Sequence, residues 1–203
     1  MATLAQMKTR IAEELQRSDL SARIASVITD AIEEYQGRRF AFNQTRATFS
    51  TVASQEYYDT TIIPTDIAQI DSMRVTANGR TTPVVESPFS LLERLSDGTS
   101  TRGEPSRWCW YGQQIRLYPI PDAIYTVSIA YLQRIDAPAD NASNAWTNEA
   151  NELIRACVCA KLCRKDLRDP EGAREYEYAE LRAVRNLLRE SSQLQGGPLV
   201  GSM

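Results

Sequence analysis

Residues 106–122, SRWCWYGQQIRLYPIPD, decide the fold, because they predict a β-hairpin near the middle of the chain. Gly112 and Gln113 suit a two-residue turn, and a glycine at the first central position is typical of type II′. This turn pairs Trp110 with Ile115 and Trp108 with Leu117. Since side chains alternate along a strand, these four large apolar residues share one face of the hairpin.

The apolar face of the hairpin has two interpretations. Burial would contribute about 1.5–3 kcal/mol for each side chain, which favours the core of a sheet. Left exposed, the same face would be large enough to serve as an interaction site. Trp108 and Trp110 would then stack on a sugar or a nucleobase, although the face carries no carboxylate or amide to orient a sugar. We favour the core, and we expect a partner on the opposite face, at Arg107, Tyr111, Arg116 and Tyr118.

The segments around the hairpin also predict strands. Residues 44–52 are rich in β-formers, and residues 67–76 lead into Asn78-Gly79, a strong signal for a type I′ hairpin turn. Apolar and polar side chains alternate over residues 125–131,. We therefore predict a β-rich region over residues 44–143.

Helical periodicity marks both ends of the chain. Thr3 and Gln6 form a capping-box pattern before a helix over residues 4–17, and a second helix follows to about residue 35,. Two more are predicted from about residue 147, the last one starting at Pro170. The predicted fold class is α+β, with a four-helix bundle of two N-terminal and two C-terminal helices over residues 1–43 and 144–190. A central antiparallel β-sheet is inserted over residues 44–143, and a flexible tail covers residues 191–203.

The last predicted helix carries apolar residues on two adjoining stripes. One stripe suffices for packing in a monomer, so two indicate burial on more than one side, as in an oligomer or in an interior helix. The residues that we expect at a subunit interface are Tyr176, Leu181, Val184 and Leu188.

The composition and motifs predict a protein that is not an enzyme. The 203 residues include no histidine, which excludes Ser-His and Cys-His catalysis,. Three of the four cysteines lie in CVCAKLC (residues 157–163), and a CxC on a helix points its thiols apart, so we expect reduced core residues and no metal. Neither Gly-rich phosphate motif is present. We predict no catalytic residue and no cofactor.

The charge and the apolar patterning limit the classes of partner that the sequence predicts. The formal net charge is −3, so no basic excess predicts binding to nucleic acid,. No apolar run approaches the length that spans a membrane. The N-terminus lacks the apolar core of a signal peptide, so we expect the protein to be made and assembled in a cytoplasm.

Several motifs occur together in one order. They are Gly103-Glu104-Pro105-Ser106, the IRLYP run from Ile115, Pro121-Asp122, and Tyr125-Thr126-Val127. EEYQGRRFAFNQ (residues 33–44) and SNAWTNEANELI (residues 143–154) flank them. This order resembles the head-to-tail adaptor proteins of tailed bacteriophages, from about residue 12 to residue 190.

The resemblance implies a structural virion protein at the head-tail interface, assembled in the host cytoplasm. Such adaptors form a ring, usually dodecameric, that docks under the portal protein and extends the DNA channel. They present a surface to the next tail protein, a nozzle or a tail tube or terminator component, and DNA passes without sequence-specific binding. C-terminal segments of relatives often contact the portal. The matching candidates here are Leu194, Gln195, Pro198, Leu199, Val200 and Met203.

The alternative function is a carbohydrate- or nucleic-acid-binding module. It uses Trp108 and Trp110, and it requires both indole rings to be exposed to solvent.

Overall fold

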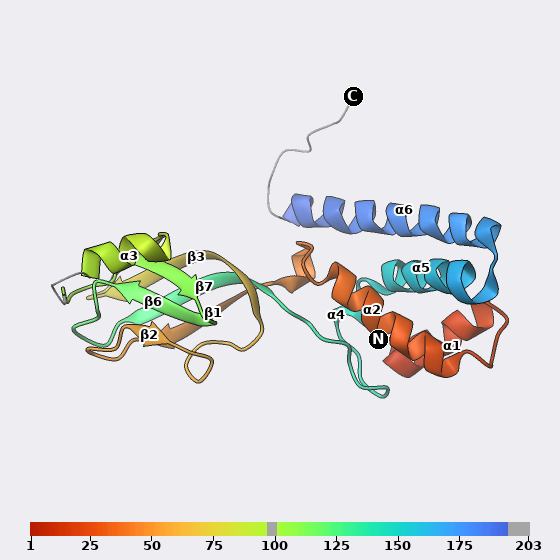
Figure 1. Cartoon of the computed structure of the whole chain (residues 1–203), viewed down its shortest axis with the longest axis horizontal. Coiled ribbons are helices and arrows are strands. Elements are labelled where there is room, and N and C mark those ends of the chain that lie inside the picture. Colours follow the sequence, from red (N-terminus) through yellow and green to blue (C-terminus); the bar gives the residue numbers. More distant parts are fainter. Residues whose placement is uncertain (97–100, 195–203) are drawn as a thin grey trace, which may run out of the picture. The chain divides into compact units, whose positions relative to one another are not determined.

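The chain divides into two compact units, shown in the computed structural model of Figure 1. The structure describes residues 1–96 and 101–194. A helical unit combines Met1–Asn43 with the chain from Arg134 onward, and a sheet unit is formed by Gln44–Gln133. Each unit has its own hydrophobic core.

The first helix begins where its capping pattern predicts. Thr3 precedes α1 (Leu4–Glu14), its hydroxyl accepts a hydrogen bond from the Gln6 amide, and the Gln6 side chain accepts one from the Thr3 amide. Both bonds satisfy amides that a helix start leaves unpaired, so the predicted capping box is confirmed.

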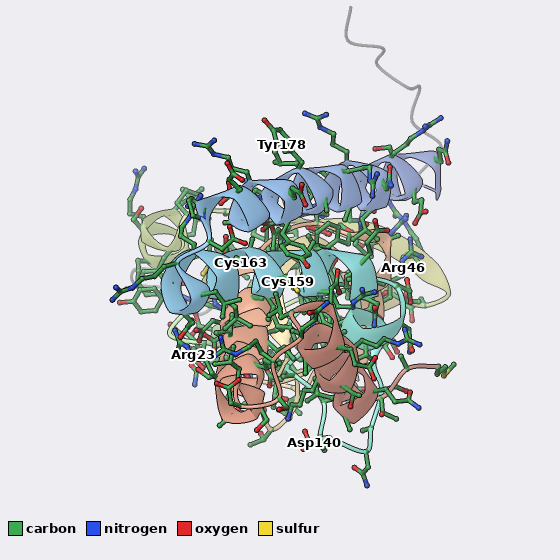
Figure 2. All side chains as sticks on the ribbon, turned by 90° about the vertical axis from the view of Figure 1, so that its right-hand side faces the viewer. Arg23, Arg46, Asp140, Cys159, Cys163 and Tyr178 are labelled. Carbon is green, nitrogen blue, oxygen red and sulfur yellow. The ribbon has the colours of Figure 1, made fainter. Side chains whose placement is uncertain are left out.

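The helical unit is layered, with α5 in the middle. Helix α6 (Pro170–Leu194) lies on one side of α5 (Asn151–Leu162), and α1 and α2 (Ser21–Tyr35) lie on the other (Figures 1 and 2). This position explains the apolar character of α5, which is covered on nearly all sides. Its buried residues are Leu153, Ile154, Ala156, Cys157, Val158, Cys159, Ala160 and Leu162.

Two signals place the start of α6. The Asp169 carboxylate accepts a hydrogen bond from the Gly172 amide at 3.0 Å, and Pro170 is the first helical residue, as the sequence predicts. The helix continues to Leu194, into the segment that the sequence assigns to a tail. Residues 195–203 of that predicted tail lie outside the described residues.

Seven strands of the described chain form one sheet, in the order β1-β7-β3-β4-β5-β6-β2. Antiparallel hairpins join β3 to β4 and β5 to β6. The strands are β1 (Gln44–Ser50), β2 (Tyr57–Tyr58), β3 (Ile67–Ala77), β4 (Arg80–Glu86), β5 (Arg107–Tyr111), β6 (Gln114–Tyr118) and β7 (Thr126–Gln133).

The predicted fold, a four-helix bundle with an antiparallel sheet inserted, is wrong. The described chain has six α-helices, including the short α3 (Phe89–Ser96) and α4 (Ala145–Asn148). It also has a short 3-10 helix, η1 (Ala41–Asn43), and a π-helical segment, η2 (Cys163–Leu167). The sheet is mixed, because β4 and β5 are parallel. Parallel neighbours require a crossover, and α3 supplies it within the sheet unit.

Both tight turns of the sheet are type I′. Asn78 and Gly79 have φ angles of 50° and 77°, as predicted for that hairpin. Gly112 and Gln113 have φ angles of 59° and 61°. Type II′ requires a positive φ only at the first position, so the predicted turn type is wrong at the second hairpin. Its register is confirmed, with Trp110 opposite Ile115 and Trp108 opposite Leu117.

Candidate functional site

The cysteines belong to the hydrophobic core. All four are free thiols and buried. Burial raises the pKa of the Cys157 and Cys159 thiols to about 12, so both stay protonated at neutral pH,. Within residues 1–96 and 101–194, no group of three or more Cys, Asp or Glu side chains is placed to hold a metal ion.

The apolar face of the β5–β6 hairpin is largely core. Trp108, Ile115 and Leu117 are buried together. Trp110, at the end of the hairpin, remains 39% exposed, so its predicted burial is wrong. Because one of the two rings is buried, Trp108 and Trp110 do not form a joint exposed platform for a flat ligand.

The opposite face of the hairpin is partly covered by α3. Tyr111 is 57% exposed and stacks on Phe89 of α3, with ring centroids 4.1 Å apart. Arg107 donates a hydrogen bond to the Ser87 hydroxyl at 3.2 Å, and the Tyr118 hydroxyl donates to the Leu95 carbonyl at 3.1 Å. Of the four residues predicted to face a partner, Tyr111 is the most available.

Arg116, also predicted at that surface, is only 3% exposed. Its guanidinium forms ion pairs with Glu56, at 2.5 Å, and with Glu93. A third hydrogen bond reaches the Ser96 hydroxyl at 3.1 Å. Arg116 therefore links α3 to the sheet, and its charge is paired with carboxylates of the same unit.

Arg116 also lies among aromatic rings. Its guanidinium carbon is 5.4 Å from the centre of the Tyr57 ring and 5.2 Å from that of Phe89. Phe89 in turn stacks on the exposed Tyr111 ring. The buried cation thus lies against the half-buried Phe89, which supports the exposed Tyr111 ring, since a cation is attracted to the faces of aromatic rings.

Helix α6 separates the four predicted interface residues into two pairs. Tyr176 and Val184 pack inward on the helical core. Leu181 and Leu188 point outward, with exposed fractions of 54% and 39%.

Tyr178 joins the outward pair. It is 74% exposed and projects from α6 on the side away from α5 (Figure 2). Residues 178, 181, 185 and 188 follow the three-four spacing of one helix face. We name Tyr178, Leu181, Arg185 and Leu188 the α6 seam. The sequence reasoning missed Tyr178, although this spacing was the signal that could have found it.

The predicted portal-binding residues lie at the end of the described chain. Leu194 is the last residue of α6. Its side chain and the residues Gln195, Pro198, Leu199, Val200 and Met203 lie outside the described part.

None of the helices in the described part of the chain has the length and apolar character needed to cross a bilayer.

The exposed apolar side chains on α6 and the exposed Tyr111 ring beside the sheet are surfaces that other proteins could contact,. The family model described as SU10 adaptor protein matches residues 2–201. The match covers nearly the whole chain, so the chain belongs to this family of phage structural adaptors. No curated protein matches the chain.

Proposed function

We propose that the protein is a head-to-tail adaptor that docks under the portal, extends the DNA channel and provides the attachment surface for the next tail protein. The match to the adaptor family over residues 2–201 carries this proposal. The net charge of −3 agrees with a channel wall that lets DNA slide, because a strongly basic wall would bind phosphates,. Assembly would take place in the host cytoplasm.

Three parts of the chain have separate roles in this proposal. The helical segments, residues 1–43 and 144–190, form the contacts between copies. The β-rich segment, residues 44–143, meets the next tail protein through Tyr111 and its neighbours. The C-terminal segment, residues 191–203, binds the portal.

The α6 seam is the proposed contact between copies in a dodecameric ring. A closed ring uses head-to-tail contacts, in which one face of a copy meets a different face of the next. The seam offers Tyr178, Leu181 and Leu188 for burial, with Arg185 between them to fix the register. Burial of each apolar side chain would contribute about 1.5–3 kcal/mol.

Leu181→Glu should prevent ring formation without unfolding the chain, because Leu181 is exposed in the single copy. Native mass spectrometry of the chain, alone and mixed with purified portal protein, measures the number of copies. Loss of apolar burial and a charge in the contact should weaken each interface by at least about 2 kcal/mol. Ile124→Glu, at an exposed position of the sheet unit, is the matched control. Rings of normal size from Leu181→Glu would contradict the seam.

Deleting residues 195–203 should weaken portal attachment. The physical reason is that the deletion removes Pro198, Leu199 and Val200, whose contacts with the portal would contribute binding free energy,. Co-sedimentation of the truncated chain with DNA-filled heads measures attachment. A full-length variant with Pro198, Leu199 and Val200 replaced by serine separates the effect of these side chains from that of length. If truncated chains complete heads normally, the portal role of this segment is wrong.

A further inference from the structure

Strand β3 is paired on both sides over only part of its length. Residues Met73–Ala77 pair with β4, whereas the pairing with β7 runs from Ile67 to Thr76. Ile67–Ser72 therefore has a strand neighbour on one side only. Four of these six residues are exposed, namely Ala68, Gln69, Asp71 and Ser72.

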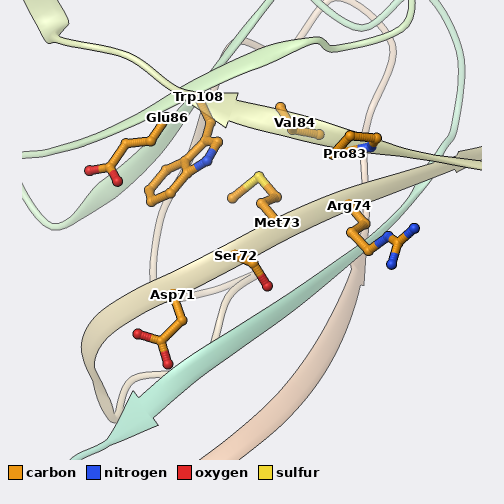
Figure 3. A pocket seen from close by; sticks show the side chains of 8 residues that line it. All are labelled: Asp71, Ser72, Met73, Arg74, Pro83, Val84, Glu86 and Trp108. Atoms are coloured by element: carbon orange, nitrogen blue, oxygen red, sulfur yellow. The ribbon is translucent and has the colours of Figure 1, made fainter. Parts of the chain in front are cut away.

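The open edge of β3 has an identifiable cause. The pairing with β7 shifts register twice, between Ile67 and Gln69 and again between Ile70 and Ser72. Such bulges bend a strand and increase its twist. Strand β3 thus curves away from β4 beyond Met73, as Figure 3 shows.

The other wall of the opening comes from β4 and β5. The Ser87 amide donates to the Trp108 carbonyl at 2.8 Å, and β4 pairs with β5 only at Val85 and Glu86. Since alternate residues of a strand direct their main-chain groups to the same edge, Trp110 presents its amide and carbonyl beyond the end of β4. Two strand edges therefore border one opening.

Two cavities lie in this opening. One of about 390 Å³ lies between Met73 and Trp108, and one of about 190 Å³ lies between Ile67–Ile70 and Trp110. We name the two cavities together the β3–β5 lane. Their walls combine apolar side chains, among them Met73, Trp108 and Trp110, with polar and charged ones beside strand edges. This combination suits a peptide main chain better than a compact small molecule.

We propose that the β3–β5 lane receives an extended segment of another virion protein as an added strand. The partner's main chain would pair with the open edge of β3, and its apolar side chains would cover the exposed part of Trp110. The Glu86 carboxylate lines both cavities, and the Arg74 guanidinium lies in the wall of the larger one (Figure 3). The segment that fits has a basic residue near Glu86 and an acidic residue near Arg74. Identification of the partner as a virion protein rests on the proposed function.

Site-specific photocrosslinking in assembled particles tests this proposal. The probe is p-benzoylphenylalanine at Gln69, which lies on the open edge, with the same probe at Thr48 on β1 as the control. Irradiation should crosslink the probe at position 69 to a different virion polypeptide. Mass spectrometry should locate the crosslink in a segment of that polypeptide with alternating apolar residues. Thr48 should give no such adduct.

A lysine in the lane should block the added strand, because lysines on strand edges oppose pairing. Ala68→Lys, combined with the probe at Gln69, should lower the adduct yield about ten-fold, equivalent to about 1.4 kcal/mol of binding free energy. Thr48→Lys is the matched control, and circular dichroism checks that both variants fold.

Acrylamide quenching adds a second readout, since Trp110 is exposed while Trp108 and Trp146 are buried. Acrylamide should quench the fluorescence of Trp110 less in assembled particles than in the free chain.

The outcomes separate this proposal from the proposed function. Adaptors that enter particles but give no adduct at Gln69 contradict only the strand-acceptor proposal. Adducts solely to a second copy of this chain, or to DNA, also overturn it. A chain that never enters particles contradicts the proposed function and the virion partner together.

Discussion

Replacing Arg116 by alanine should lower the free energy of unfolding of the sheet unit by about 3–5 kcal/mol, because it leaves a carboxylate without its buried partner. The Glu56 side chain, paired with Arg116 at 2.5 Å, is only 23% exposed. The contacts of the guanidinium with Tyr57, Phe89 and Ser96 would be lost as well. Urea unfolding followed by circular dichroism measures the change.

Two further variants show whether the loss has this cause. Glu93→Gln should cost no more than about 1 kcal/mol, because the Glu93 side chain is 53% exposed and solvent screens its charge,. The double variant Arg116→Met, Glu56→Leu removes both charges of the more buried pair and should recover much of the stability. If Arg116→Ala costs less than about 1 kcal/mol, the ion-pair account is wrong.

Stability and docking must be separated at this hairpin. Loss of Arg116 would also shift α3 and the Phe89–Tyr111 pair that it supports. An assembly defect in Arg116→Ala therefore says nothing specific about a partner surface. Tyr111 is the better position for that question, because its ring is exposed and its removal leaves the buried ion pairs intact.

Replacing Trp146 by alanine should destabilise the helical unit by about 3–5 kcal/mol, as expected for a large buried ring. Trp146 is fully buried, and its ring packs edge-on against Phe40 and Phe42, at centroid distances of 6.2 and 5.1 Å. Its indole N–H donates to the Ile135 carbonyl at 2.7 Å. Urea unfolding followed by circular dichroism at 222 nm reports the loss, because this unit holds most of the helix.

Trp146→Phe is the matched control, since it keeps an apolar ring and removes the donor. It should cost about 1–2 kcal/mol, much less than alanine, because the Ile135 carbonyl still accepts from the Gln36 side chain at 3.2 Å,. Equal losses for phenylalanine and alanine would contradict the packing explanation and assign the stability to the hydrogen bond.

Local signals in the sequence predicted the elements well. The capping box at Thr3 and Gln6 and the cap at Asp169 predicted where two helices begin. The Asn78-Gly79 turn and the hairpin register about Gly112-Gln113 were also correct. Each of these depends on residues only a few positions apart, so the sequence pattern contains the whole cause.

Predictions that depended on distant contacts fared less well. Period-two alternation assigned Arg116 and Trp110 to the correct faces of the hairpin, but the prediction about which face was buried held only in part. Helix α3 crosses over one face and buries Arg116, and the curvature of β3 leaves Trp110 half uncovered. The two apolar stripes of α6 were visible in the sequence, yet only packing on α5 separated Val184 from Leu181.

By itself, the sequence determined where helices and strands form, how the hairpins pair and to which adaptor family the chain belongs. Only the tertiary structure decided that β4 and β5 are parallel, that Arg116 is a buried cation and that an open lane lies beside Trp110. The physical reason is the separation along the chain of the residues that interact. Caps, turns and alternation are set by neighbouring residues, whereas the exposure of a face depends on which distant segment covers it.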